Sequence, residues 1–224
     1  MSKVDTFLAG DGLPSRLLYR VCRAIVTTVV RLFTRMRIEG REHVPATGAF
    51  VLAPVHRSII DTPIAACVTT RRLRFMGKDS VWKVRPVGWV ASALGAFPVS
   101  RGTADREALR RGVAVLEMGE ALVLFPEGER KSGPVVQPLF DGAVYIAVKA
   151  GVPIVPVGIG GSEPVLPKGA KLPRPRRVRV VVGPPIPPPV EQGGRVPRSV
   201  LRAHSDALHT ELQRLFDEAE RRAR

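Results

Sequence analysis

The feature of this sequence that most limits its possible folds is an alternation of short apolar runs with longer helical patterns. Nearly all-apolar runs of strand length lie at residues 49–54, 73–76, 96–100, 121–125, 153–159 and 178–182. Strands of this kind are typical of a sheet that is buried on both faces. We therefore expect an α/β domain, with a mostly parallel, mixed central sheet and helices on both of its faces.

The stretches between these runs have the periodicity of amphipathic helices, in which apolar residues recur every three or four positions. The helices are expected at residues 16–36, 58–68, 103–119, 143–150 and 199–222. We expect turns or loops at residues 37–48 and 78–95. A chain of 224 residues can bury one such core without a second large domain.

The first predicted helix is strongly amphipathic. One side carries apolar residues and the opposite side carries arginines: Leu18, Val21, Ile25, Val29, Leu32 and Met36 against Arg16, Arg20, Arg23 and Arg31. Its longest apolar or hydroxyl run, residues 24–30, is far shorter than the roughly 20 residues that span a bilayer. The apolar side could lie on an anionic membrane or dock on its own domain. We divide the chain into a membrane-associating segment, residues 1–36, and an α/β domain, residues 37–224.

A strongly basic composition indicates an anionic partner. The chain has 35 Lys and Arg against 20 Asp and Glu, which gives a formal net charge of +15. Lipid headgroups, nucleic acid and phosphorylated small molecules all fit this charge. Aromatic residues make up only 5% of the chain, which argues against stacking on single-stranded bases. We expect an anionic membrane surface as a partner, and no nucleic acid.

Two further observations concern the compartment. Cys22 and Cys67 lie inside apolar patterns and form no Cys-x-x-Cys motif, as expected of small core residues in a reducing compartment. The first fifteen residues hold no apolar stretch, so we expect no signal peptide. Together with the basic charge, these features favour the cytoplasmic face of the cell membrane, with peripheral or monotopic attachment.

An imidazole and a carboxylate follow the first apolar run at a spacing that suits acid/base chemistry. His56 falls in the turn after residues 49–54, and Asp61 falls in the first turn of the next helix. The stretch from Ser58 to Asp61 also fits a capping box, in which the carboxylate only binds a backbone N–H. The two interpretations are compatible, because a carboxylate that caps a helix can also orient a histidine.

Other polar residues gather just past the predicted ends of strands. Arg101, Glu127 and Arg130 join His56 there, and the carboxyl ends of strands are where α/β sheets bind ligands. Several competing motifs are absent: there is no Gly-x-Ser-x-Gly elbow, no phosphate-binding P-loop and no dinucleotide fingerprint. No cluster of His, Cys and carboxylates has the spacing of a metal site, so we expect neither metal nor cofactor.

Four blocks of the chain resemble those of the glycerolipid acyltransferases, in the group that acylates 1-acylglycerol 3-phosphate. They are His56-x4-Asp61, Gly95 to Arg101, Phe125 to Arg130 and Val152 to Val157. The resemblance implies acyl-CoA or acyl-carrier protein as co-substrate and a lysophospholipid as acceptor.

The resemblance also implies roles for individual residues. His56 would be the general base of a direct attack, and Asp61 would hold its other ring nitrogen. Arg101, Arg130, Glu127 and Gly128 would form the substrate-binding part of the site, and the two guanidinium groups suit the acceptor phosphate. Glu127 would position the acceptor or those arginines, and backbone amides near Ser58 are candidate donors to the oxyanion.

The chain departs from the family pattern at three positions. Val55 stands where Asn is usual, Ser100 where Asp is common and Glu129 where Thr is usual. The acceptor therefore stays open, and another lipid or glycolipid hydroxyl is an alternative. A thioesterase is a second alternative, and a non-catalytic basic module that binds membrane or nucleic acid is a third.

Overall fold

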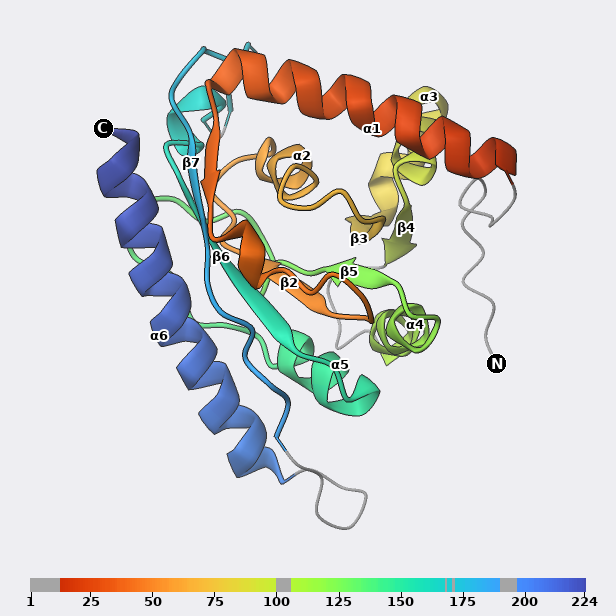
Figure 1. The fold of residues 1–224 in the computed structure, drawn as a ribbon, viewed down its shortest axis with the longest axis vertical. Helices are drawn as coiled ribbons and strands as arrows, with labels where there is room; N and C mark the ends of the chain where they lie inside the picture. The colour runs from red at the N-terminus through yellow and green to blue at the C-terminus, as the bar shows by residue number, and fades with distance from the viewer. Residues whose placement is uncertain (1–12, 100–105, 168, 171, 190–196) are drawn as a thin grey trace.

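The computed structural model describes residues 13–99, 106–167, 169–170, 172–189 and 197–224, and it places one sheet between two layers of helices (Figure 1). The described strands are β1 (Arg37–Glu39), β2 (Val51–Pro54), β3 (Leu73–Lys78), β4 (Ala96–Val99), β5 (Ala121–Val123), β6 (Ile154–Gly160) and β7 (Arg179–Val182). Their order across the sheet is β1-β7-β6-β2-β5-β3-β4.

The sheet is mixed and mostly parallel, as expected. Strands β6, β2, β5, β3 and β4 are parallel neighbours, whereas β7 runs antiparallel to β6 and β1 runs parallel to β7. Strand β2 lies between β6 and β5. The carboxyl ends of these three parallel strands therefore meet at one edge of the sheet.

Helices cover both faces of the sheet (Figure 1). On one face lie α1 (Leu13–Thr34), α2 (Asp61–Ala65) and α3 (Arg85–Ala93). On the other lie α4 (Arg106–Glu117), α5 (Gly142–Ala150) and α6 (Arg198–Ala223). Three short 3₁₀ helices are η1 (Arg41–His43), η2 (Asp79–Lys83) and η3 (Glu163–Val165).

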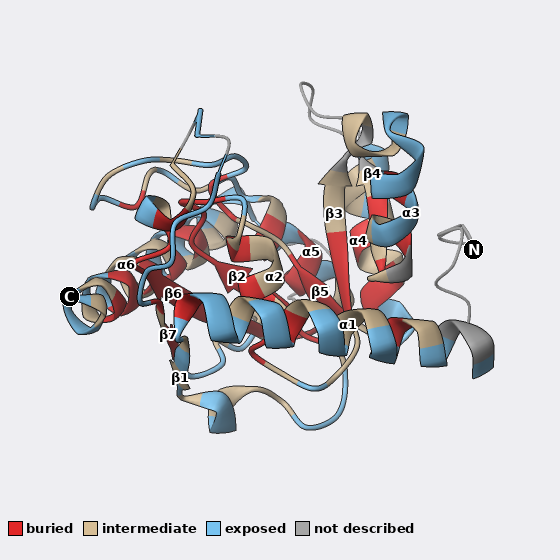
Figure 2. Cartoon of the chain, turned by 90° about the horizontal axis from the view of Figure 1, so that it is seen from above, coloured by how far each residue is buried: buried red, intermediate tan, exposed pale blue. Residues whose placement is uncertain are grey.

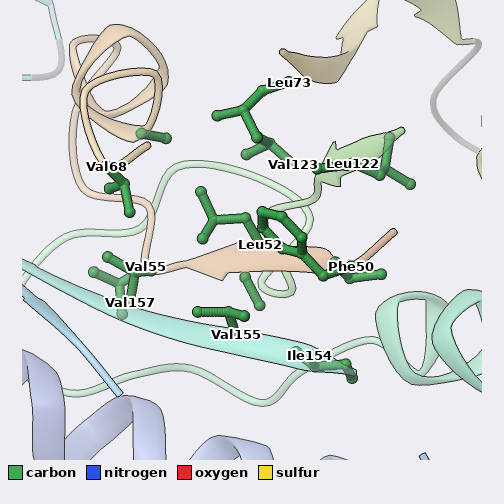
Figure 3. Packing of buried hydrophobic residues seen from close by; sticks show 14 of the residues in the cluster. Phe50, Leu52, Val55, Val68, Leu73, Leu122, Val123, Ile154, Val155 and Val157 are labelled. Carbon is green, nitrogen blue, oxygen red and sulfur yellow. The ribbon is translucent and has the colours of Figure 1, made fainter. Parts of the chain in front are cut away.

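The hydrophobic core is centred on β2 (Figure 3). Large side chains on this strand and on the segments around it are fully buried, and each contributes about 1.5–3 kcal/mol of transfer free energy. They include Phe50, Leu52, Leu73, Leu122 and Val155. The core thus surrounds the strand that leads into His56.

Glycines of β6 allow α6 to pack directly on the sheet. A Cβ atom added at Gly158 would lie 2.3 Å from the backbone of Leu215, and one at Gly160 would lie 2.2 Å from that of Ala219. No side chain can occupy such a space. Helix and strand therefore touch backbone to backbone.

Three elements differ from the sequence-based expectation. Strand β1 lies where a turn was predicted, because three residues on an edge strand with two exposed positions carry no strand pattern. Helix α3 lies in the predicted loop 78–95, and Pro86 stands at its start rather than outside it. Helix α2 begins at Asp61 instead of residue 58.

The apolar side of α1 faces away from the domain (Figure 2). Ile25 is 59% exposed and Leu32 is 76% exposed, whereas Tyr19, Thr27 and Thr34 are buried against the protein. The apolar row on the helix itself is therefore not covered by the described part of the domain, whereas Met36, just past the end of the helix, packs against the core. None of the described helices combines the length and apolar character that crossing a membrane requires.

Candidate active site

His56 lies in the turn that follows β2, at the edge where the parallel strands end. Its Nδ1 lies 3.1 Å from Oδ2 of Asp61, and its ring stacks on Phe125 with the centroids 4.0 Å apart. A tenth of its side-chain surface is exposed. In the tautomer that donates from Nδ1 to the carboxylate, Nε2 is left as an acceptor. No described residue occupies Nε2.

Asp61 binds the backbone of the preceding turn and orients the histidine, but it does not cap α2, whose N-cap residue is Ile60 and which has no side-chain cap. Oδ2 accepts the backbone N–H groups of Arg57 and Ser58, each at 2.6 Å, in addition to Nδ1 of His56. The carboxylate is fully buried. Because Asp61 binds these two amides, the turn stays open as far as residue 60, which explains the late start of α2.

Three of the backbone amides in this turn are already bound to carboxylates. The amides of Arg57 and Ser58 both point at Asp61, and the amide of His56 donates to Oε2 of Glu127 at 3.2 Å. A donor already bound to a buried carboxylate is not free to bind a developing oxyanion.

Glu127 follows β5 and is sealed inside the protein. Besides the His56 amide, its carboxylate accepts Nη1 of Arg57 at 2.7 Å and the amide of Gln137 at 2.9 Å. Its side chain is 0% exposed. The structure thus corrects its predicted substrate contact, because Glu127 meets no open pocket and its arginine partner among the described residues is Arg57.

Gly128 and Arg130 lie on the surface next to the histidine turn. The amide of Lys131 donates to the carbonyl of His56 at 2.9 Å, so this segment runs directly against that turn. Gly128 has φ of 73°, and a Cβ there would lie 2.7 Å from the ring of Phe140. Arg130 is exposed. Arg101 lies outside the described residues, so its predicted position beside them is not tested.

An apolar cavity adjoins α2. It has a volume of about 480 Å³ and lies between α1, α2, α3 and the sheet. Thr62 and Pro63, directly after Asp61, line it together with Val26, Phe75 and Val90. This cavity was not predicted from the sequence, because its walls come from segments that are distant along the chain.

Sequence reasoning also missed Arg57. An arginine beside a surface turn is usually solvated, yet this one is only 3% exposed. Nothing in the local sequence indicates its burial. Within the described ranges, no three His, Cys or carboxylate side chains gather as a metal site requires.

Comparisons with known proteins agree with this geometry. A family model described as Acyltransferase matches residues 35–160. A 1-acyl-sn-glycerol-3-phosphate acyltransferase of Bacillus subtilis (strain 168) is 25% identical over 170 residues, which cover 75% of this chain and 82% of that protein.

Two further similarities are informative. The crystal structure of the 1-acyl-sn-glycerophosphate (LPA) acyltransferase PlsC from Thermotoga maritima superposes with a TM-score of 0.73 at 25% identity, covering 90% of this chain and 80% of that one. A lyso-ornithine lipid O-acyltransferase of Pseudomonas aeruginosa is 30% identical over 105 residues, which cover 46% of this chain and 40% of that protein.

Proposed function

Because this chain belongs to the acyltransferase family, we propose that it moves a fatty acyl group from an acyl thioester to the free hydroxyl of 1-acylglycerol 3-phosphate, giving phosphatidate. The observation that carries this proposal is the pair of His56 and Asp61 at the end of the central strand β2. Relatives with the matching printed name support the choice of acceptor.

The proposed reaction is a direct attack with His56 as general base. Nε2 of His56 takes the proton of the acceptor hydroxyl while the oxygen bonds to the thioester carbonyl carbon. The tetrahedral intermediate then expels the thiolate, which takes the proton back from the imidazolium. Asp61 stabilises the imidazolium across the 3.1 Å contact with Nδ1. No covalent acyl-enzyme forms, and the chemistry calls for no metal or organic cofactor.

The apolar cavity beside α2 suits the acyl chain of the donor. Its walls are almost entirely apolar, and Thr62 and Pro63 connect it to the helix turn that begins with Asp61. A long hydrocarbon chain gains about 0.8 kcal/mol for each methylene buried there. We take acyl-CoA or acyl-carrier protein as the donor.

The acceptor phosphate needs cationic groups near His56. Arg130 is exposed, and its neighbour Lys131 is bonded to the His56 carbonyl. A guanidinium can offer two parallel donors to a phosphate. We assign Arg130 to this role, together with Arg101 from the second sequence block.

The exposed apolar row of α1 suits a membrane surface, where the lipid acceptor resides. Leu17, Val21, Ile25 and Val29 form this row at intervals of four residues. Helix α3 packs beside α1 and exposes Val87, Trp89 and Val90. Such an interfacial helix, on a chain of net charge +15, fits peripheral attachment of residues 1–36 to the anionic cytoplasmic face of the membrane.

A turnover assay of the purified protein tests the function. Acyl-CoA, or acyl-carrier protein in a parallel reaction, is supplied with lysophosphatidate, and wild type is expected to form phosphatidate. His56→Ala should lose about 10²–10⁴-fold of the rate, the usual contribution of a general base. Full activity of His56→Ala would contradict the mechanism and favour a non-catalytic basic module. Free fatty acid without acylated acceptor would identify a thioesterase.

A different lipid acceptor is the second candidate. The similarity to a lyso-ornithine lipid O-acyltransferase favours it, as do Val55 and Glu129, at which the chain departs from the family pattern. The same assay with lysolipids that carry or lack a phosphate separates the two. Equal rates on both would contradict the roles of Arg130 and Arg101.

A further inference from the structure

The arginine that follows His56 lies beneath the catalytic turn instead of in solvent. We infer that Arg57 is a positioning residue for acyl transfer, which fixes the main chain of His56 by holding Glu127 against it. This inference rests on the proposed role of His56 as general base. It extends that role to a residue that itself reaches no substrate, since the side chain of Arg57 is only 1% exposed.

The guanidinium of Arg57 uses its donors on four groups from three segments. Nη1 donates to both carboxylate oxygens of Glu127, at 3.0 and 2.7 Å, and to the carbonyl of His56 at 3.2 Å. Nε donates to the carbonyl of Gly133 and Nη2 to that of Val135, each at 3.1 Å. One side chain therefore ties together the ends of β2 and β5 and the loop after β5.

The guanidinium of Arg57 also packs on an aromatic ring from α6, in the helix layer on the other face of the sheet. The Arg57 Cζ atom lies 4.7 Å from the centre of the Phe216 ring on α6. A cation over an aromatic face is attracted to it, and burial strengthens the attraction. Loop and helix are also bonded to each other, because Nε2 of Gln213 donates to the carbonyl of Pro134 and its Oε1 accepts the amide of Val136.

Every polar group of His56 other than Nε2 has a hydrogen-bond partner. Its amide donates to Glu127, its carbonyl accepts from Arg57 and Lys131, and Nδ1 is bonded to Asp61. Asp61 controls the ring, whereas Arg57 and Glu127 control the backbone that carries it. A shift of about 1 Å in a reacting group can cost about 10²-fold in rate. The pair of Arg57 and Glu127 is therefore expected to affect the rate of turnover as well as the stability of the fold.

Energetics give a way to separate positioning from a purely structural role. A buried ion pair is often replaceable by neutral groups with little loss of stability, whereas removal of one partner leaves an unpaired buried charge. The double variant Arg57→Met/Glu127→Gln removes both charges and keeps an oxygen for the His56 amide. It should be clearly more stable than Arg57→Met alone, yet its histidine turn lacks the bonds to Gly133 and Val135.

The experiment measures kcat, KM for both substrates, and the thermal midpoint of wild type, Arg57→Lys, Arg57→Met and the double variant. The double variant should have a midpoint close to that of wild type, unchanged KM values and a kcat about 10²-fold lower. Arg57→Lys keeps the charge but lacks the planar set of N–H donors of a guanidinium. Its kcat should therefore lie between that of wild type and that of the double variant.

A second buried pair provides a matched control. Arg74 and Glu120 form an ion pair with side-chain exposures of 3% and 16%, at the opposite edge of the sheet where β3 and β5 begin. Arg74→Met/Glu120→Gln removes both charges in the same way, so its thermal midpoint should also stay close to that of wild type, and its kcat should be unchanged.

The outcomes are distinct. Wild-type kcat in the stable double variant of residues 57 and 127, or an equal loss of kcat in the control, would overturn the positioning role. Failure of the proposed function would look different: wild type would transfer no acyl group, or His56→Ala would keep full activity.

Discussion

At the scale of single residues, the candidate site is organised by one carboxylate oxygen. Oδ2 of Asp61 accepts three donors, two from the backbone and one from the His56 ring. The amide bonds shape the turn, and the ring bond selects the tautomer with Nε2 free. The same atom thus links local folding to the proposed proton transfer.

Asp61→Asn separates these two tasks. The amide oxygen can still accept backbone N–H groups, but it no longer stabilises an imidazolium. We expect kcat to fall by about 10²–10⁴-fold, with a stability loss of about 1–3 kcal/mol from the weaker buried bonds. Steady-state kinetics and urea unfolding measure the two effects. A kcat within threefold of wild type would contradict the pairing of Asp61 with the base.

Gly128→Ala tests the close approach of Phe140. Both Gly128 and Gly119 have positive φ, 73° and 78°, but a Cβ at Gly119 would meet nothing within 4 Å. Each substitution should cost about 1–2 kcal/mol for the left-handed backbone. Gly128→Ala should cost more, because it must also displace the Phe140 ring. Equal unfolding free energies for the two variants would show that the ring moves freely.

The residues divided clearly into those that the sequence could predict and those that it could not. His56 and Asp61 were predicted because both lie in one short turn whose geometry is local, and their predicted contact is confirmed. The burial of Glu127 and Arg57 was missed, because it depends on Gln137, Gly133 and Phe216, which approach only in the folded chain. The family and the O-acyltransferase class predicted from the four blocks are confirmed.

At the scale of elements, α1 is notable because its apolar row points outward. Its inner side is formed by Tyr19, Thr27 and Thr34, with Arg23 donating to carbonyls at the end of α2. Val26 and Val30 also lie on this inner side, so α1 covers the domain with both polar and apolar side chains. The purely apolar row is left for another surface.

Ile25→Glu tests whether that surface is a bilayer. Ile25 is 59% exposed, so glutamate fits without strain, and the thermal midpoint should stay unchanged. Loss of about 2 kcal/mol of apolar burial should weaken binding to vesicles of phosphatidylglycerol and phosphatidylcholine by roughly 30-fold. Co-sedimentation measures this. Leu172→Glu, at another exposed residue far along the chain, serves as the control. Equal binding by both variants and wild type would exclude α1 from the membrane contact.

The elements that were missed share a physical cause. Strand β1 is only three residues long, and it is stabilised by pairing with β7, more than 130 residues away along the chain. Helix α3 is held by packing on α1 and η2 rather than by its own pattern, which contains Pro86 and Gly88. The long helices and the buried strands were predicted because their periodicity is visible without tertiary contacts.

At the scale of the whole molecule, burial of weak acids gives stability an alkaline limit. Burial raises the pKa of the Cys67 thiol and also that of the Tyr19 phenol, whose oxygen accepts the amide of Leu73. Both groups are neutral when protonated. The unfolded chain therefore releases their protons at lower pH than the folded chain does. Their contribution to the free energy of unfolding is therefore fully present below their ordinary pKa values, and it is lost as the pH rises through the raised pKa values of the folded state.

We therefore expect the unfolding free energy to be flat near pH 8 and to fall above about pH 9. Urea unfolding between pH 7 and pH 11 measures this. Cys67→Ala should remove part of the alkaline decline, because alanine cannot ionise there. An identical decline in Cys67→Ala and wild type would show that this thiol is not responsible.

The α/β class, with its mixed and mostly parallel sheet, was predictable from the apolar runs alone. The order of the strands was not, since nothing local places β2 between β5 and β6. That order nevertheless decides which loops meet at His56.

The bare contact between β6 and α6 has a consequence for how this chain can vary. With hydrogen as the only tolerated side chain at Gly158 and Gly160, a methyl group there would push aside a rigid rod of 26 residues. That rod carries Phe216, on which the Arg57 guanidinium rests. Mutations at Gly158 or Gly160, where the sheet contacts α6, can therefore lower the rate of acyl transfer at His56 without changing any residue that contacts substrate.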